Sequence, residues 1–190
     1  AVGNSKVLTE HDNLFELSDQ YTYKNGTSIQ TGSSSANPVQ RSLQSRLDDI
    51  VNVRSFGANG DGTDQTLALQ RAIDQLFLPW SSATDADSLR KRITLKLDAG
   101  LYKISNSLKV PPYVNLVGDG SDKTVIEQTG AHAVIETING NGINAQTSST
   151  NQSNIIKLEG MTLKSYLTNP ALKLSSTKDS QFIDIKLQGP

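Results

Sequence analysis

The chain has 190 residues, enough to bury a core in one or two domains, and its low aromatic content of 5% favours short strands and turns over helical packing. Its 18 Lys and Arg nearly balance its 19 Asp and Glu, so charge gives no reason to expect nucleic acid or an anionic membrane as a partner. Cysteine is absent, which excludes disulfides and Cys-based metal sites, and no apolar run approaches the length of a membrane-spanning helix or a signal-peptide core.

Residues 1–36 are polar, and we interpret them as an arm that ends in the linker sequence TGSSSAN at 31–37. Tyr21 and Tyr23 alternate ahead of Asn25-Gly26, which is a hairpin signal, and 27–31 is the expected return strand. A lone hairpin is marginal in water, so this arm needs a surface to pack on. We favour an arm that docks on another protein; the alternative is an unstructured terminus.

Residues 37–50 predict a short neck helix. Asn37 is a suitable N-cap, and Pro38 suits the first helical position. The apolar residues that follow are spaced by four, four and three, which puts them on one helical face: Val39, Leu43, Leu47 and Ile50. So short a helix is marginal alone, so we expect this face to pack against the same helix of other copies. The alternative is packing on the β-domain of its own chain.

The stretch Val51–Ile73 predicts a strand, a glycine-rich turn and a helix. Residues 51–56 alternate as a strand would. Three glycines of the turn can adopt positive φ at little steric cost: Gly57, Gly60 and Gly62. Asp64 or Thr63 is placed to cap the helix. The expected apolar stripe of that helix is Leu67, Leu69, Ile73 and Leu76.

The same stretch fits a long motif, V-x-V-x-D-F-G-A-x-G-D-G-x-T-D-D-T-x-A-x-Q-x-A-I-D. The matching residues are Val51, Val53, Phe56, Gly57, Ala58, Gly60, Asp61, Gly62, Thr63, Asp64, Thr66, Ala68, Gln70, Ala72, Ile73 and Asp74. The departures are Ser55 and Gln65 in place of Asp and a turn shorter by one residue before Thr63. In this motif the chain resembles phage tailspikes and related pectate lyase-like polysaccharide lyases. The resemblance implies a right-handed parallel β-helix, which this segment caps without catalysing.

After a polar loop at 81–92, short apolar runs between turns predict further strands. They are Ile93–Leu97, Leu101–Ile104, Leu108–Val110, Tyr113–Val117, Thr124–Glu127, Ala133–Ile138, Ile155–Leu158, Met161–Leu163, Ala171–Leu174 and Phe182–Leu187. The segments at Met161 and Ile183 lie 22 residues apart (183 − 161), a plausible coil length for stacked coils that bury their inner faces on one another. The polar excursion at 139–154 is either a binding loop or a plain connection.

The expected domain organisation is an arm at 1–36, a neck helix at 37–50 and a mainly β domain, the start of a parallel β-helix, at 51–190. Because the sequence stops at Pro190 just after a predicted strand, we expect the β-helix to continue in a longer protein.

The carboxylates of the sequence are scattered. A retaining glycosidase needs two carboxyl groups about 5–5.5 Å apart, and an inverting one needs about 6.5–9.5 Å. The acidic residues on predicted strands are Glu127, Glu136, Glu159 and Asp184, which we interpret mainly as solvated faces, although Glu127 and Glu136 are placed to face a groove. Those in the glycine turns are better explained as turn and cap formers: Asp61, Asp64, Asp119 and Asp122. In the resembling enzymes the catalytic acids lie on later coils or between subunits, so we predict no catalytic residue here.

Other motifs carry little. His11 and His132 have no companions at metal-binding spacing, so we predict no metal site. Residues 140–145 fit G-x-G-x-x-A but lie in polar loop sequence with no helix after them. No P-loop or G-x-S-x-G elbow is present, and we predict no cofactor.

The resemblance implies a phage tailspike or tail-fibre protein that is homotrimeric. Residues 1–36 would attach it to phage tail or baseplate proteins of the virion, and the β-helix would recognise a host surface glycan. Any depolymerase site would lie outside this chain. Two other hypotheses stay open: a fragment of a cellular polysaccharide lyase or glycoside hydrolase, and a purely structural tail or baseplate adaptor.

Overall fold

A computed structural model describes most of the chain from residue 46 onward and a few residues before it. The described ranges are 21–22, 31, 33–34, 36–37, 39–42, 46–77, 93–138, 155–175 and 177–189. The chain divides into two compact units, Ala1–Asp49 and Ile50–Pro190. No helix among the described residues has the length and hydrophobicity to cross a membrane.

In the first unit, strand β1 (Tyr21–Thr22) pairs antiparallel with strand β2 (Gln40–Arg41). The predicted strand character at Tyr21 is therefore confirmed, but its partner is β2. The rest of the predicted hairpin, residues 23–30, lies outside the described residues.

The neck helix predicted over 37–50 is wrong at both ends. Gln40–Arg41 is strand β2 and Ile50 begins strand β3, while Arg46 and Leu47 are helical. Two of its expected apolar contacts, Val39 and Leu47, are 52% and 51% exposed. A short amphipathic stripe with nothing packed on it does not hold a helix, whereas β2 gains backbone hydrogen bonds from β1.

The second unit begins with strand β3 (Ile50–Asn52), which leads into the 3₁₀ helix η1 (Val53–Phe56). The strand predicted over 51–56 therefore ends at Asn52. The Asn52 side chain explains this, because its Oδ1 accepts the Arg54 backbone N–H at 2.9 Å and caps η1. Gly57, with φ of 93°, closes η1 by donating its N–H to the carbonyls of Arg54 and Val53.

Strand β4 (Asp61–Asp64) lies inside the predicted glycine turn and leads to helix α3 (Thr66–Phe77). As predicted, Asp64 caps the helix: its carboxylate accepts the N–H and hydroxyl of Thr66 at 2.9 and 2.6 Å. The stripe prediction was wrong for Leu67, which is 78% exposed. The buried residues of α3 are Leu69, Gln70, Ala72, Ile73 and Phe77.

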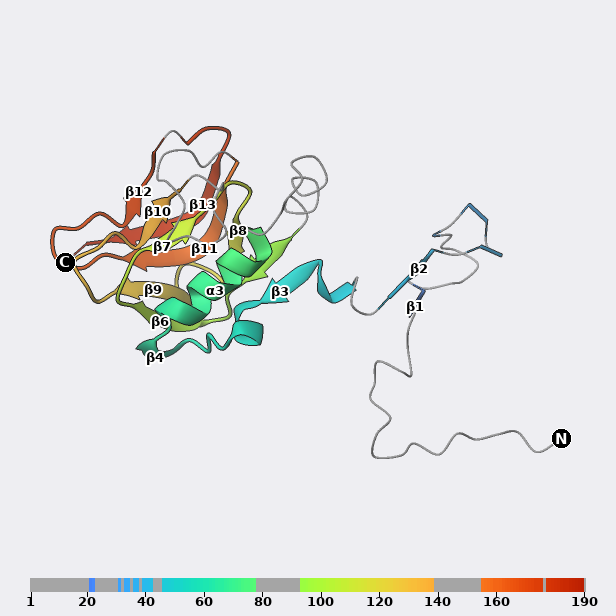
Figure 1. Ribbon diagram of the computed structural model, residues 1–190, viewed down its shortest axis with the longest axis horizontal. Coiled ribbons are helices and arrows are strands. Elements are labelled where there is room, and N and C mark those ends of the chain that lie inside the picture. The colour runs from blue at the N-terminus through green and yellow to red at the C-terminus, as the bar shows by residue number, and fades with distance from the viewer. Residues whose placement is uncertain are drawn as a thin grey trace, which may run out of the picture. The chain divides into compact units, whose positions relative to one another are not determined.

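The remaining strands are short and parallel. They are β5 (Thr94–Lys96), β6 (Gly100–Ile104), β7 (Leu108–Val110), β8 (Asn115–Val117), β9 (Thr124–Gln128), β10 (Ile135–Thr137), β11 (Lys157–Lys164), β12 (Leu172–Lys173) and β13 (Gln181–Gln188). One curled sheet has the order β3-β5-β8-β11-β9-β6-β4, with β13 on β11, and a smaller sheet has the order β12-β10-β7 (Figure 1). Each strand pairs with the equivalent strand of the next coil, so this unit is mainly β with the stacked parallel strands of a β-helix.

The coil spacing differs from the prediction. Met161 pairs with Ile185, which lies 24 residues later (185 − 161), and not with Ile183. The two strands predicted at Ile155–Leu158 and Met161–Leu163 are one strand, β11, because Gly160 takes a φ of 65° and bends the strand without ending it. A pattern of period two loses its register at such a bend.

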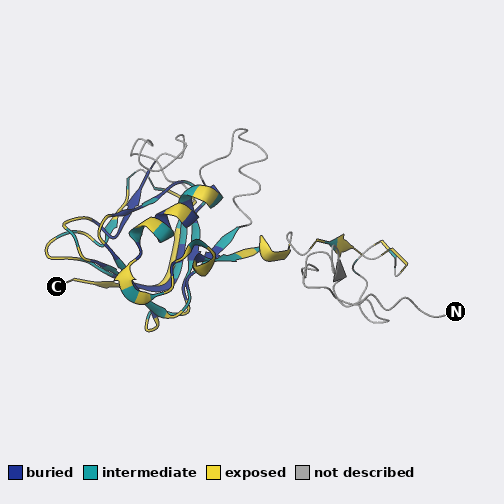
Figure 2. Ribbon diagram, turned by 60° about the horizontal axis from the view of Figure 1, so that its bottom comes forward, coloured by how far each residue is buried: buried dark blue, intermediate teal, exposed yellow. Residues whose placement is uncertain are grey.

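Inward side chains stack from coil to coil. Leu95, Leu116 and Leu158 occupy equivalent register positions on three coils and are buried, as are Tyr102 and Ile126 on the other arm of the sheet. Figure 2 shows this buried interior, with α3 half exposed beside it. Burying each such side chain contributes roughly 1.5–3 kcal/mol, so the stack holds the coils in register and leaves the outward residues free to vary.

Candidate functional site

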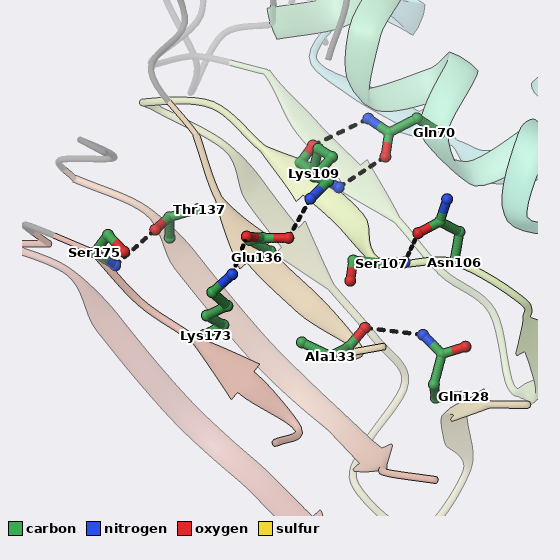
Figure 3. A network of polar contacts seen from close by, with 10 residues as sticks. All are labelled: Gln70, Asn106, Ser107, Lys109, Gln128, Ala133, Glu136, Thr137, Lys173 and Ser175. Atoms are coloured by element: carbon green, nitrogen blue, oxygen red, sulfur yellow. Dashed lines mark hydrogen bonds and ion pairs between the residues drawn. The ribbon is translucent and has the colours of Figure 1, made fainter. Parts of the chain in front are cut away.

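The outer face of the small sheet carries a ladder of three charged side chains. Glu136 on β10 stands in register between Lys109 on β7 and Lys173 on β12. Its carboxylate forms an ion pair with Lys109 Nζ on one side and with Lys173 Nζ at 2.6 Å on the other (Figure 3). Opposite charges on adjacent strands bind the three coils together.

The surroundings of Glu136 keep it ionised. Burial acts to raise the pKa of this carboxyl, since Glu136 is only 7% exposed, but the hydrogen bonds and positive charges of the two lysines outweigh burial and lower the pKa. A buried carboxylate held by two ammonium groups is an acceptor and a structural tie. It does not have the raised pKa of a general acid.

Helix α3 closes the free edge of this sheet through a single amide. Gln70 accepts the Lys109 backbone N–H at 2.7 Å and donates to the Lys109 carbonyl at 3.0 Å, as a neighbouring strand would (Figure 3). Gln70 also donates to Asp74 at 2.8 Å. This pairing explains why a glutamine stands at the motif position, where it covers an edge that would otherwise be open.

The other strand carboxylates are also occupied. Glu127 pairs with Lys164 at 2.7 Å, and Glu159 pairs with Lys157 at 2.5 Å. Asp184 accepts the N–H and hydroxyl of Ser121 at 3.1 and 2.7 Å, which lowers the pKa of its carboxyl. The structure thus gives each of these carboxylates a cation or donor partner, in line with their interpretation as structural groups.

The turn carboxylates act as expected for three of the four. Hydrogen bonds from Thr63 lower the pKa of Asp61, and hydrogen bonds from Ser105 and Thr66 lower that of Asp64. Asp119 binds Lys96 Nζ at 2.6 Å and the Ala99 N–H at 2.8 Å, which joins two coils at one corner and lowers the pKa of its carboxyl.

Two weaker calls fall elsewhere. His11 and the G-x-G-x-x-A segment at 140–145 lie outside the described residues. Within the described ranges, no group of three or more His, Cys, Asp or Glu side chains is placed to hold a metal ion.

A hollow of about 660 Å³ lies beside the start of α3, between the glycine-rich turn and residues 105–107. Leu67, Arg71 and Asn106 are among its lining residues. The carboxylates at its rim, Asp61 and Asp64, are bound to their own turn, so the polar groups of this hollow already have partners.

A second cleft, of about 210 Å³, lies at the corner where the chain enters β8, β11 and β13. Its walls combine apolar and polar side chains: Tyr113, Asn115, Ile155, Lys157, Asp179 and Gln181. Here one polar atom is left over. Asn115 donates from Nδ2 to Thr94 Oγ1 at 2.9 Å, while its Oδ1 is buried and has no hydrogen-bond partner in the described part of the chain.

Comparison with known proteins identifies the fold family. Residues 50–181 match the model of rhamnogalacturonase A/epimerase, pectate lyase-like proteins. The chain belongs to this pectate lyase-like family. The match begins at β3 and ends at β13, so it covers almost the whole second unit and confirms the family expected from the Val51–Asp74 motif.

Among solved structures, the chain is similar to the ORF18 protein of Geobacillus virus E2, with a TM-score of 0.56 and 23% identity. The likeness covers 78% of this chain and 30% of that protein, so the pectate lyase-like chain spans about a third of the length of its structural neighbour. No curated protein sequence matches the chain.

Sequence reasoning found Glu136 but missed its two lysines, and it passed over Asn115 altogether. Lys109, Glu136 and Lys173 become neighbours only through the register of β7, β10 and β12. Their spacing along the chain is unequal, because the loop between β10 and β11 lengthens one coil, so a fixed repeat does not reveal the ladder.

Proposed function

We propose that this chain belongs to a phage tailspike or tail-fibre protein whose β-helix recognises a host surface polysaccharide. The observation that supports this most is the pectate lyase-like family match over residues 50–181, because the family descriptions name polysaccharide-directed proteins. The structural neighbour is a phage protein, which supports a phage over a cellular origin.

In this proposal residues 1–36 attach the protein to tail or baseplate proteins of the virion, and the assembly is a homotrimer with a right-handed β-helix. The exposed apolar side chains of Val39 and Leu47 in the first unit are in keeping with a contact to other copies. Host glycan binding is assigned to the stacked coils, where outward side chains are free of core packing. We predict no catalytic residue in this chain.

The first test is localisation on purified phage particles. Antibodies raised against residues 50–190 should decorate the tail, and a phage that lacks residues 1–36 of this protein should assemble tails without it. A phage that deletes only 81–92 is the matched control and should retain the protein. Normal incorporation after deletion of 1–36 contradicts the anchoring role.

Two further candidates differ in what they predict. A cellular lyase or glycoside hydrolase would cleave polysaccharide and be absent from virions. A structural adaptor would remain in the particle but retain no saccharide on a glycan array, and that pair of results would favour it over the spike.

A further inference from the structure

We propose that the corner cleft beside β8 and β11 is a binding site for a neutral saccharide, with the side-chain amide of Asn115 as its central polar contact. The proposal rests on the proposed glycan recognition for the class of ligand. The location rests on the cleft itself, which neither the family match nor the structural neighbour assigns.

The first argument is the unpaired amide atom. Asn115 Oδ1 is buried and has no partner within the described residues, although buried polar atoms in proteins nearly always have one. Exchanging the oxygen and nitrogen of the amide would pair the other atom with Thr94 and leave an unpaired N–H instead. A ligand hydroxyl both donates and accepts, so it satisfies the free atom in either orientation.

The second argument is the backbone around the cleft. Tyr113, Ile155 and Asp179 all line the cleft, and all have positive φ, of 68°, 58° and 52°. Each lies two residues before a strand position that pairs in register, namely Asn115, Lys157 and Gln181. Positive φ is rare for a β-branched residue such as Ile155, and such outliers gather at ligand sites. The repeat of the same conformation in three coils builds one continuous corner.

The third argument is rigidity. The Lys157 N–H donates to the Val114 carbonyl at 2.8 Å, and the Gln181 N–H donates to the Ile156 carbonyl at 2.9 Å. These hydrogen bonds tie the strand ends of three coils together beneath the cleft. A wall held by backbone ladders is already formed before a ligand arrives, which lowers the entropic cost of binding.

The charges around the cleft favour an uncharged ligand. Lys157 is paired with Glu159 at 2.5 Å, so their charges largely cancel. Asp179 then leaves an excess negative charge in the lining, which disfavours a uronic acid and favours hydroxyl groups. The lining supplies Tyr113 and Ile155 as apolar surface and Asn115, Asp179 and Gln181 as hydrogen-bonding groups, a mixture that suits a sugar ring.

The test uses the full chain and two kinds of defined probe, uncharged tetrasaccharides of glucose, galactose or rhamnose and tetragalacturonic acid, titrated by calorimetry. At least one neutral probe should bind, and Asn115→Ala should weaken it by about tenfold, the effect of losing a hydrogen bond. Thr94→Val is the matched control, because it removes the partner of Nδ2 and leaves Oδ1 in place. It should change affinity by less than about twofold.

A second readout does not depend on the variants folding well. In wild-type protein the Asn115 side-chain amide signals in a ¹⁵N–¹H spectrum should shift on addition of the neutral probe. Binding that is unaffected by Asn115→Ala, with unshifted amide signals, overturns the cleft while leaving glycan recognition by the β-helix intact. Binding of the acidic probe alone also overturns it. If no probe binds, the cleft is overturned and tail localisation then decides whether a structural role replaces the proposed function.

Discussion

Two polar surfaces of the second unit lie close in the chain but are built in opposite ways. On the outer face of β7, β10 and β12, Glu136 is paired with two lysines, and Gln70 satisfies both backbone groups of Lys109. At the corner beside β8 and β11, Asn115 keeps an unpaired buried oxygen and three lining residues adopt costly backbone angles. The first surface is saturated, and the second is not.

The difference separates stability from binding. A saturated buried network rigidifies the fold and has no valence left for a ligand. An unsaturated, pre-formed cleft costs stability and is retained where a ligand completes it. We therefore expect substitutions in the Lys109–Glu136–Lys173 ladder to change the free energy of unfolding and leave saccharide affinity alone, and substitutions at Asn115 to do the reverse.

The largest effect is expected for Glu136→Ala. It leaves Lys109 and Lys173 facing each other without a carboxylate, and we expect the free energy of unfolding to fall by about 3 kcal/mol, at the low end for a broken buried pair because both lysines keep some access to water. Urea denaturation measures this. Glu159→Ala is the control, since its pair with Lys157 is one-third exposed on both sides and should cost less than about 1 kcal/mol. Equal losses from the two variants would refute the special role of the ladder.

A smaller loss is expected for Gln70→Ala. The substitution removes two hydrogen bonds to the Lys109 backbone and exposes the edge of β7, so the free energy of unfolding should fall by about 2 kcal/mol. Gln75→Ala, on the exposed side of the same helix, should change it by less than about 0.5 kcal/mol. Hydrogen exchange should also speed up at Lys109, and protection that stays unchanged there would argue against the cap.

The family and the start of the β domain were readable from sequence because they rest on local chemistry. The glycines and Asp64 of the motif form turns and caps within a few residues of themselves. Most strands were predicted close to their observed bounds, since β5, β6, β7, β8 and β9 alternate cleanly between turns.

The parts that failed depend on contacts distant in sequence. The neck prediction assumed a helix, but β2 is fixed by pairing with β1, some 20 residues earlier. The 22-residue repeat failed because Gly160 bends β11 and shifts the register. Neither the Glu136 ladder nor the Asn115 cleft has a local signature, because each is assembled from three coils of unequal length.

Acid should expose the ladder more gently than mutation does. The folded-state pKa of Glu136 is lowered, so its stabilising contribution is present at neutral pH and is lost as the pH falls below about 4.3, the usual pKa of an unfolded-chain glutamate, and on through the lowered folded value. Stability against pH, measured by urea denaturation, should therefore fall less steeply in Glu136→Gln than in wild type over this acid range. Parallel curves would mean that Glu136 does not titrate differently in the folded chain.

The smallest change in stability is expected for Asn115→Leu, and that small size is its value. The variant removes a buried oxygen that has no partner together with one hydrogen bond to Thr94, so the free energy of unfolding should change by no more than about 1 kcal/mol in either direction. Asn52→Leu is the matched comparison, because Asn52 uses both amide atoms, accepting from Arg54 and donating to Asp98, and should cost about 2 kcal/mol. If Asn115→Leu were as costly as Asn52→Leu, the corner amide would be a structural tie like the ladder, and the contrast between the two surfaces would fail.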